Sequence, residues 1–354
     1  MRYSSRNRIK QLLDNSGLLG SKSINNFQYN SYDFSDETIL ITGAAGSIGS
    51  GLTHHLLASN FKKLIVIDNA ETPLFYLKCE VEAKKIENVE FILMDIRDNE
   101  SMAWLFETYN PSLIFHTAAY KHVELMEQNP YEAVKLNIHA TKCLAKLSVK
   151  HNVKKFVFIS TDKAVNPIGV MGMTKFIAEN YLNVLNNDSK TAFVTTRFGN
   201  IFGSNGSVVP LFLKQLNSGQ PLTVKDKKAS RFFIDKRKAC DLILTVAQMD
   251  THHYDLVSFD MNSPIKIIDL AKVMLSSVSD ELKTHIEITN LSSEEKLTES
   301  MISKNEQLIP STNKDIYFVK KKSDIQLNLK PLKNINTSIK NEDIKLILKH
   351  ISYS

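Results

Sequence analysis

The chain of 354 residues has few cysteines and no long apolar run, and each deficit argues against a class of protein. The cysteines lie far apart and without the spacing of metal ligands, so we expect reduced, buried thiols of a cytoplasmic protein and no metal site. No segment approaches the roughly 18 apolar residues of a membrane span. The first residues also lack the apolar core of a signal peptide. The three cysteines are Cys79, Cys143 and Cys240.

Strong charge of one sign is also missing, as are internal repeats and low-complexity tracts. The formal net charge is +6, and its scattered lysines fit an anionic small molecule at least as well as nucleic acid. No interleaving of basic and aromatic residues supports nucleic-acid binding. One basic stretch predicts an N-terminal amphipathic helix, which lies either on a membrane surface or, as we favour, in solvent or docked as an arm. Its residues are Arg2, Arg6, Arg8, Ile9, Lys10, Leu12 and Leu13.

What is present begins with three evenly spaced glycines after a short apolar run. They follow the pattern Gly-x-x-Gly-x-x-Gly and precede an apparent helix. Glycine lets a pyrophosphate approach the backbone, and the free N–H groups of a first helical turn bind its charge. An ordinary strand-to-helix turn gives the same pattern, but Asp68 ends the next apolar run about 20 residues later, where a carboxylate can hold an adenosine ribose. We predict a dinucleotide site at Gly43, Gly46, Ser47, Ile48, Gly49, Asp68 and Asn69.

Apolar strand-like runs alternate with helical patterns in the first half of the chain, which indicates a parallel sheet covered on both faces. We predict an α/β fold, a Rossmann-like doubly wound parallel sheet with a smaller C-terminal α/β substrate lobe. The expected parts are an N-terminal arm (1–36), an NAD-binding Rossmann domain (37–200) to which later segments return, a mainly substrate-binding lobe (201–320) and a peripheral tail (321–354). The expected strands are 38–42, 63–68, 89–94, 112–116, 154–160 and 191–196, and the expected helices are 47–59, 71–87, 98–108, 130–151, 172–186, 208–217, 234–249, 265–277 and 342–351.

Residues that follow the strands are the candidates for the site, because ligands of an open parallel sheet bind beyond the carboxyl ends of its strands. Asp95 and Ile96 follow the third strand, where they are placed to meet an adenine edge. Ala118 and Ala119 follow the fourth strand, and their small side chains leave room for a cofactor ribose and nicotinamide against the backbone.

A hydroxyl, a carboxylate and an ammonium follow the fifth strand at Thr161, Asp162 and Lys163, and Lys175 lies on the next helix. Adjacent unlike charges tune each other's proton affinity, which suits general acid and base catalysis. The simpler interpretation is a loop ion pair beside a solvated helical lysine. A dinucleotide turn nearby favours the catalytic interpretation.

Eight segments together resemble the extended short-chain dehydrogenase/reductase superfamily, and within it the UDP-N-acetylglucosamine 4,6-dehydratases of bacterial polysaccharide biosynthesis. The resemblance runs from about residue 17 to about residue 318, and its middle segments are specific below the superfamily level. Long relatives carry membrane helices ahead of this domain, and we expect a soluble form without them. The segments are TGAAGSIG (42–49), DNAETPLFY (68–76), DIRD (95–98), HTAAYKHVELMEQNPYEAV (116–134), STDKAVNP (160–167), MGMTK (171–175), RFGNIFGSNGSVVP (197–210) and SRFF (230–233).

The resemblance implies a redox-neutral loss of water from UDP-N-acetylglucosamine, in which a bound cofactor oxidises the sugar at C4 and returns the hydride to C6. The expected cofactor is NAD, and NADP is the less favoured alternative. It implies that Asp162 is the acid for the departing hydroxyl and Lys163 the base at C5. Lys175 orients the nicotinamide ribose, and Thr161 or Ser160 meets the sugar near O4. It also implies a homodimer or larger homo-oligomer that pairs through helices near 130–150 and 172–186. The expected substrate contacts are Lys121, Asn200, Ser207 and Arg231.

Two residues depart from the pattern of that family. Met171 replaces the usual tyrosine of a Tyr-x-x-x-Lys motif, and a thioether cannot take a proton. A subset of the dehydratases is similar in this respect, and the change moves proton transfer onto Asp162 and Lys163. Ser292 stands where relatives have an arginine near the substrate diphosphate, and Arg231 is a candidate to supply that charge.

Three alternatives to this function stay open at this point. The nearest is a C5-inverting dehydratase or a 4-epimerase on the same substrate. A non-catalytic nucleotide-binding partner in glycan assembly agrees with Met171 and Ser292 but not with the intact segment from Thr161 to Lys163. Nucleic-acid binding is the weakest of the three.

Overall fold

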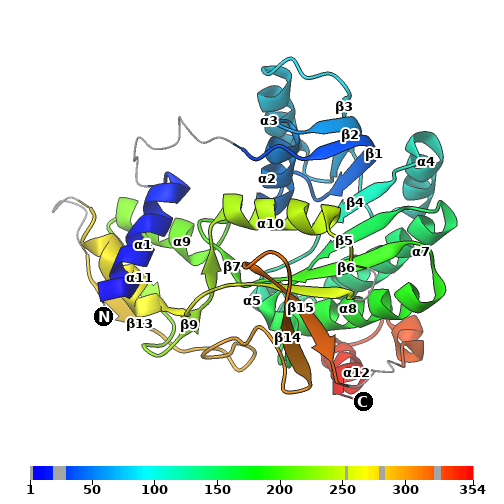
Figure 1. Ribbon diagram of the computed structural model, residues 1–354. Helices are drawn as coiled ribbons and strands as arrows, with labels where there is room; N and C mark the ends of the chain where they lie inside the picture. Colours follow the sequence, from blue (N-terminus) through cyan, green and yellow to red (C-terminus); the bar gives the residue numbers. More distant parts are fainter. Residues whose placement is uncertain (1–2, 19–28, 252–253, 279–283, 323–327, 354) are drawn as a thin grey trace.

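A large twisted sheet dominates the protein in a computed structural model that describes residues 3–18, 29–251, 254–278, 284–322 and 328–353 (Figure 1). The strand order is β14-β15-β11-β6-β5-β4-β1-β2-β3, and the strands from β11 to β3 are parallel to one another. The run from β3 to β6 has the Rossmann order 3-2-1-4-5-6, which confirms the predicted fold class. The bounds are β1 (Asp33–Thr42), β2 (Asn60–Asp68), β3 (Val89–Leu93), β4 (Leu113–His116), β5 (Lys155–Ile159), β6 (Ala192–Arg197), β11 (Leu256–Phe259), β14 (Glu306–Pro310) and β15 (Ile316–Lys321).

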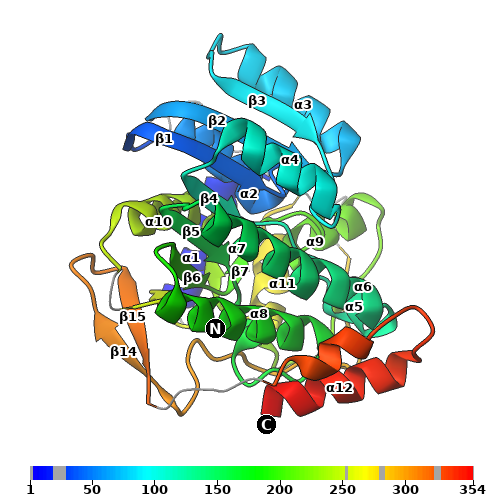
Figure 2. The ribbon, with the colours of Figure 1, turned by 90° about the vertical axis from the view of Figure 1, so that its right-hand side faces the viewer.

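Helices cover both faces of this sheet, because successive side chains of each strand point to opposite faces. Ile39 and Ile41 of β1 belong to the core under α2, α3 and α10, whereas Leu40 belongs to the core under α4, α7 and α8. Figure 2 shows α4, α7 and α8 on one side of the sheet. The bounds are α2 (Ser47–Leu56), α3 (Glu71–Glu82), α4 (Asn99–Tyr109), α7 (Thr141–Lys150), α8 (Val170–Asp188) and α10 (Lys236–Gln248).

The predicted helix 130–151 is interrupted in the structure. It consists of α6 (Pro130–Ala133), a π-helical stretch η2 (Val134–Ala140) and α7, and α5 (Val123–Gln128) precedes it. A π-helical stretch shifts the hydrogen-bond ladder and is often found beside functional sites. The apolar pattern alone predicted a continuous helix because it does not distinguish the two ladders.

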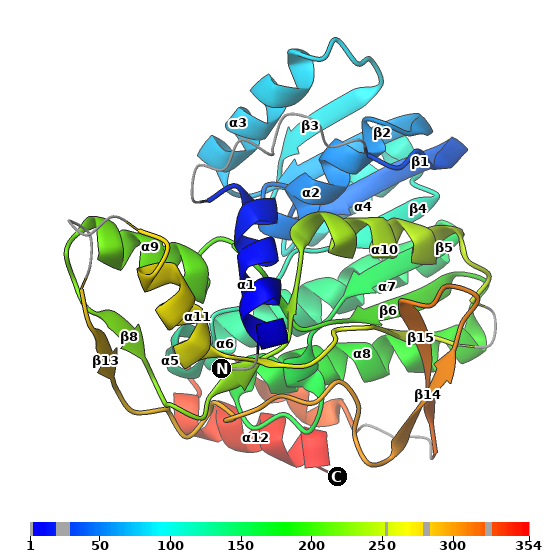
Figure 3. The ribbon, with the colours of Figure 1, turned by 60° about the vertical axis from the view of Figure 1, so that its left-hand side comes forward.

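A smaller lobe holds its own apolar core beyond the end of the parallel strands (Figure 3). Its elements are α9 (Val208–Asn217), α11 (Ile267–Leu275) and short strand pairs formed by β7 (Asn200–Ile201), β8 (Leu222–Val224), β9 (Ser230–Arg231), β10 (Phe233–Ile234), β12 (Ile265–Lys266) and β13 (Ile286–Ile288).

The N-terminal helix α1 (Tyr3–Ser16) packs into this smaller lobe against α11. Ile9, Leu12 and Leu13 are buried in the core of the lobe, and the Arg8 guanidinium donates to the carbonyl oxygens of Phe233 and Met261 at 2.9 and 2.8 Å. The apolar face proposed for a membrane surface is therefore covered by the protein itself. Arg2, part of the same prediction, lies outside the described residues.

The segment 321–354, predicted as a peripheral tail, contributes to the core. After β15, a short helix η5 (Lys330–Asn334) and α12 (Asn341–Tyr353) follow, and α12 packs against α6 and α8. Ile344, Leu348 and Ile351 of α12 have no exposed surface. An amphipathic helix with three fully buried residues cannot be a loose appendage.

The prediction of buried thiols holds for one cysteine and is wrong for another. Cys240 is buried, Cys143 is half-buried and Cys79 is exposed, and all three are free. Cys79 lies on α3, whose outer face turns to solvent, so its place in an apolar pattern did not ensure burial. None of the helices in the described ranges is long and apolar enough to cross a membrane.

Candidate functional site

The glycine turn is too tight for a larger residue at Gly43 or at Gly49. Gly43 has φ +65°, and a Cβ atom there would lie 2.6 Å from the Ala118 Cα atom. A Cβ atom on Gly49 would lie 2.3 Å from the Gly43 carbonyl oxygen. The backbone between β1 and α2 is therefore bare where a pyrophosphate would approach it, and α2 presents its N-terminal amides there. Gly46 precedes the first helical residue, Ser47.

Asp68 supports this turn from the end of β2. Its Oδ2 atom accepts a hydrogen bond from the Ala45 N–H at 2.9 Å, and its Oδ1 atom accepts one from the Ala70 N–H at 2.9 Å. An ionised carboxylate has about four lone-pair directions, so both oxygens keep capacity for the hydroxyls of a ribose. The side chain thus stands at the correct edge of the sheet and is held in place.

Asp95 lies at the next strand end, but it is bonded to neighbouring side chains. Arg97 Nη2 donates to its Oδ2 atom at 2.6 Å, and Arg97 Nη1 reaches Glu132 Oε2 at 2.7 Å. The hydrogen bond from Arg97 lowers the pKa of Asp95, and Asn69 also bonds to this carboxylate. Ile96 is buried behind them. At the predicted adenine contact, Asp95 is therefore ion-paired with Arg97 and Ile96 is buried.

Ala118 and Ala119 are half-buried where the chain leaves β4. Below them, His116 joins Thr42 and Thr141 through distances of 2.7 Å (Nδ1 to Oγ1) and 2.9 Å (Nε2 to Oγ1). Burial lowers the pKa of His116 to about 3, so the ring is neutral at physiological pH. This neutral bridge links β1, β4 and α7 directly under the site.

The predicted acid and base form a pair at the end of β5. Lys163 Nζ donates to Asp162 Oδ1 and to Asn200 Oδ1, both at 3.0 Å, and Thr161 Oγ1 donates to Asp162 Oδ1 at 3.0 Å. Asp162 has no exposed surface. Within the described part of the chain, Asp162 Oδ2 and Ser160 Oγ are buried without a hydrogen-bond partner. Unpaired buried polar atoms are costly, and a ligand at this strand end could complete their hydrogen bonds.

Lys175 and Met171 share one face of α8, four residues apart. Lys175 is 5% exposed, and its Nζ atom lies 3.8 Å from the centroid of the Phe158 ring. Burial lowers its pKa to about 7, although Glu179 opposes this shift. Met171 is buried in an apolar cluster with α12. A Cβ atom on Gly172 would lie 2.4 Å from the Lys163 carbonyl oxygen, so α8 touches the segment that carries the acid and base.

A pocket opens beside this pair toward the smaller lobe. It is lined by Lys163, Gly172, Arg231, Lys296 and Glu299, among others, so the structure places the predicted base and Arg231 in one pocket. The Arg231 guanidinium donates to the carbonyl oxygens of Ser230 and Leu297 at 2.9 and 3.1 Å, which orients it.

Of the other expected substrate contacts, Ser207 lies on the loop between β7 and α9 and Lys121 lies against this loop, whereas Asn200 begins β7 and accepts the hydrogen bond from Lys163. Lys121 Nζ donates to the Asn205 carbonyl oxygen at 2.7 Å, and the Asn205 N–H donates to Ser47 Oγ at 3.1 Å. The Ser207 hydroxyl oxygen is buried and lacks a hydrogen-bond partner among the described residues. This loop therefore spans from the glycine turn to the segment after β4. Lys121 and Ser47 both contact Asn205 of this loop.

Three residues of this region were missed by the sequence analysis. Asn137 in η2 accepts from the Tyr120 N–H at 2.9 Å and donates to Thr174 Oγ1 at 3.0 Å, which ties the π-helical stretch to α8. Lys296 Nζ donates to the Val165 carbonyl oxygen at 2.7 Å and to Glu299 Oε2 at 3.1 Å. An asparagine inside an apolar helical pattern was the available signal for Asn137. No local signal marked Lys296 or Glu299 as neighbours of the fifth strand end.

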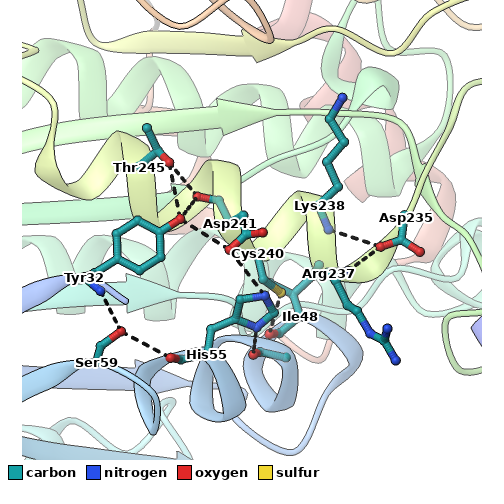
Figure 4. A network of polar contacts seen from close by, with 11 residues as sticks. Tyr32, Ile48, His55, Ser59, Asp235, Arg237, Lys238, Cys240, Asp241 and Thr245 are labelled. Atoms are coloured by element: carbon teal, nitrogen blue, oxygen red, sulfur yellow. Dashed lines mark hydrogen bonds and ion pairs between the residues drawn. The ribbon is translucent and has the colours of Figure 1, made fainter. Parts of the chain in front are cut away.

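A second polar network holds α2 against α10, behind the glycine turn (Figure 4). Tyr32 Oη donates to the Asp241 carbonyl oxygen at 2.9 Å, and His55 Nε2 lies 3.6 Å from Asp241 Oδ1. Burial lowers the pKa of His55. Ile48, a predicted cofactor contact, directs its carbonyl oxygen to the Cys240 thiol at 3.9 Å. This network fixes the helix whose N-terminus faces the predicted dinucleotide site.

Known proteins share this arrangement of sequence and fold. The sequence model of a family described as polysaccharide biosynthesis protein matches residues 39–321. The chain is 40% identical to the capsular polysaccharide biosynthesis protein CapD of Staphylococcus aureus, over 78% of this chain and 47% of CapD. It is 31% identical to an inverting UDP-N-acetylglucosamine 4,6-dehydratase of Campylobacter jejuni, over 83% of this chain and 88% of that enzyme. The X-ray structure of Pen from Bacillus thuringiensis superposes with a TM-score of 0.74 at 28% identity, over 90% and 98% of the two chains. The chain spans about half the length of CapD.

Proposed function

The chain belongs to the family of polysaccharide biosynthesis proteins, and from this membership we propose that it is an NAD-dependent UDP-N-acetylglucosamine 4,6-dehydratase. The observation that carries the proposal is the pair at the end of β5. Asp162 is fully buried with Oδ2 unpaired among the described residues, Lys163 lies 3.0 Å from Oδ1, and Lys163 lines the pocket that holds Arg231. An acid and a base adjacent to each other beside a dinucleotide turn suit the removal of water across C5 and C6.

The residues present fit a bound dinucleotide. The turn at Gly43 and Gly49 leaves no room for a Cβ atom, and Asp68 stands at the end of β2. A carboxylate at this place favours NAD over NADP, because it repels a 2′-phosphate. Bound NAD would supply hydride transfer, accepting a hydride from sugar C4 and returning it to C6. The residues of the protein then have only to transfer protons and to position the substrate and the cofactor.

Lys163 and Asp162 perform the two proton steps in which the proposed reaction eliminates water. Transfer of one proton from Lys163 Nζ to Asp162 across 3.0 Å leaves a free amine and a neutral acid. The amine removes the C5 proton, which a 4-keto group acidifies, and Asp162 protonates the C6 hydroxyl that leaves as water. The proton taken by Lys163 replaces the proton given by Asp162, so the pair regains its starting charge state when water has left. As C6 receives its hydride, Lys163 gives a proton to C5, and the proton released from O4 in the oxidation restores the charge of Lys163.

The O4 proton needs another route because Met171 cannot accept it. We assign this route to Thr161 and Lys175, connected by water. The pKa of Lys175, lowered by burial to about 7, lets its amine take up or release a proton near neutral pH. A proton acceptor whose pKa lies near the working pH is the efficient choice.

Arg231 is our candidate for the diphosphate contact. Ser292 cannot supply the positive charge that relatives place in that segment, whereas Arg231 is 9% exposed and lines the pocket. A guanidinium with two of its hydrogen bonds fixed on carbonyl oxygens keeps other donors for phosphate oxygens. Lys121, Asn200 and Ser207 are assigned to the remaining contacts.

The direct test is incubation of the purified protein, with bound cofactor verified, with UDP-N-acetylglucosamine in D₂O. Mass spectrometry should find a product that has lost one water and carries one solvent deuterium at C5. Absence of turnover by the cofactor-loaded protein would reject the dehydratase and favour the non-catalytic nucleotide-binding partner. An isomer of unchanged mass would identify a 4-epimerase instead.

A C5-inverting reaction is the second candidate. It is favoured by the similarity to the Campylobacter enzyme, whose name specifies inversion. Proton NMR of the same product distinguishes the two, because inversion at C5 changes the coupling pattern of the ring. The acid and base assigned above serve either outcome.

We also infer a homodimer that pairs through the outer faces of α7 and α8. Val184 of α8 is 46% exposed, and a second copy of the chain would cover it in such a pair. Light scattering after gel filtration should give about twice the chain mass of 40.1 kDa. A mass near that of one chain would reject the dimer.

A further inference from the structure

The C-terminal helix α12 lies outside the part of the chain that the family model matches, which ends at residue 321. It nevertheless packs against α8 and α6, as Figure 2 shows. Its buried residues belong to the same apolar cluster as the first turns of α8. The cluster includes Val170, Met171, Met173 and Ile177 of α8 and Ile344, Leu348 and Ile351 of α12.

Polar contacts connect α12 to the turn that precedes α8. Tyr353 Oη donates a hydrogen bond to the Pro167 carbonyl oxygen. Lys345 Nζ pairs with Glu127 Oε2 at 3.4 Å, and Glu127 Oε1 in turn accepts a hydrogen bond from the Val170 N–H. Both ends of the short turn from Pro167 to Val170 are thus tied to α12, one directly and one through Glu127.

This turn links the two parts of the proposed catalytic machinery. On its N-terminal side are Asp162 and Lys163, and on its C-terminal side α8 carries Lys175. Contact here is close, because a Cβ atom on Gly172 would lie 2.4 Å from the Lys163 carbonyl oxygen, and one on Gly169 would lie 2.9 Å from Glu127 Oε1. A shift of the turn would therefore displace both parts.

We propose that α12 is a brace for the active site, and that Tyr353 and Lys345 are positioning residues for the pair Asp162 and Lys163. The proposal rests on the proposed function for its effect on turnover. Neither residue touches the acid or the base: they act on the turn between Pro167 and Val170. The part of the chain that the family model matches ends at residue 321, so this support comes from outside the matched part.

The test uses the full chain with Lys345→Gln, Tyr353→Phe and the double variant. Lys349→Gln is the matched control, since Lys349 is an exposed lysine one turn further along α12. We expect the double variant to lose about tenfold or more in kcat, because small misplacements of catalytic groups are expensive. KM for UDP-N-acetylglucosamine and binding of NAD should stay near the parent values. Lys345→Arg should retain activity because it keeps the ion pair.

Hydrogen–deuterium exchange tests the brace independently of any turnover. In the double variant, amides of residues 163–173 should exchange faster, while those of residues 39–50 in the glycine turn should not. Unchanged exchange in residues 163–173 would overturn the proposal, and so would an equal increase in both segments, which indicates general loosening. Faster local exchange with an unaltered kcat would overturn the positioning role. If the unmodified protein lacks dehydratase activity, the proposed function fails, and the exchange data still decide whether α12 holds the turn.

Discussion

At the scale of single residues, Asp162 is the side chain whose surroundings say most about chemistry. The fold buries it fully while one carboxylate oxygen finds no partner in the described ranges. Desolvation of an unpaired carboxylate oxygen costs stability, and active sites tolerate such costs where a ligand completes the bonds. The assignment of Asp162 as the acid predicts that its substitution lowers turnover but not NAD binding.

Asp162→Asn should lower kcat for water loss by about 10²- to 10⁴-fold, the usual contribution of a general acid. Binding of NAD should be spared, because the glycine turn and Asp68 lie on other strands. Steady-state product formation and calorimetric NAD binding measure the two quantities. Asp36→Asn, at an exposed position of β1, is the control and should behave like the parent. Near-normal turnover of Asp162→Asn would contradict the assignment.

The lowered pKa of Lys175 predicts that the stability of the protein depends on pH. In the unfolded chain its amine keeps a proton up to about pH 10.5, whereas burial lowers the pKa in the folded protein to about 7. Between these values the unfolded state binds more protons, so the contribution of Lys175 to the free energy of unfolding rises with pH. Below about pH 7 both states are protonated, and the dependence disappears.

Lys175→Met should remove this dependence. After removal of cofactor, the melting temperature of the parent protein should rise relative to that of the variant between pH 7 and pH 9, as followed by differential scanning calorimetry. Lys146→Met, on an exposed position of α7, should instead run parallel to the parent. Parallel curves for Lys175→Met would show that the buried ammonium does not titrate in this range.

At the scale of elements, the turn between β1 and α2 brings a strand, a helix and the segment after β4 within van der Waals contact. Gly43 combines φ +65° with the approach of Ala118. Gly219 has a similar φ of +63°, but a Cβ atom there would meet no other atom within 4 Å. Substitution of Gly219 therefore measures only the cost of a left-handed backbone, whereas substitution of Gly43 adds the cost of a steric clash.

Gly43→Ala should abolish binding of NAD, because the added methyl group meets the Ala118 backbone at 2.6 Å and forces the turn open. Gly219→Ala should lose only the cost of a left-handed alanine, about 1 kcal/mol, and keep NAD binding. Isothermal calorimetry with NAD and urea unfolding distinguish the two effects. Equal NAD affinity in the two variants would show that the turn does not carry the cofactor.

At the scale of the whole molecule, Arg197 joins three distant parts of the chain. It ends β6, is 2% exposed, and pairs with Glu179 of α8 at 2.7 Å and with Glu306 of β14 at 3.0 Å. Burial by itself would raise the pKa of Glu306, but the charge of Arg197 and the hydrogen bonds at this carboxylate lower it. Its stabilising contribution is therefore present above about pH 4.5, the ordinary value, and is lost as the pH falls through the lowered pKa.

Glu306→Gln should lower the free energy of unfolding at pH 7 by about 1.5–3 kcal/mol, the usual worth of a hydrogen bond to a charged group. It should also make the protein less sensitive to acid below about pH 4.5, since the titrating group is gone. Urea unfolding at pH 7 and pH 4 gives both numbers. Glu342→Gln, at an exposed position of α12, serves as the control. A loss of stability that is the same for both variants would exclude a role for the Arg197 network.

Most of the fold followed from local patterns. Six of the seven strands of the parallel run from β11 to β3, and the helices on its faces, were predicted to within about five residues, because burial on two faces leaves continuous apolar strands. The seventh, β11, was not predicted. The break at η2 was missed, since α- and π-helical ladders share nearly the same apolar pattern. The packing of α12 was missed, and the docking of α1 was only one of the alternatives considered, because both are amphipathic helices whose partners lie far away in the sequence.

The sequence by itself determined which segments form the parallel strands and which chemical types stand at their ends, because both depend on local periodicity and on the alignment of parallel strands. Tertiary structure alone decided that Asp162 is fully buried, that Arg231 and Glu299 share a pocket with Lys163, and that α12 reaches the turn before α8. These contacts join residues that are far apart in the sequence, and Tyr353 and Pro167 are separated by 186 positions. Such pairs depend on how every intervening element packs, and no local pattern of residues contains that information.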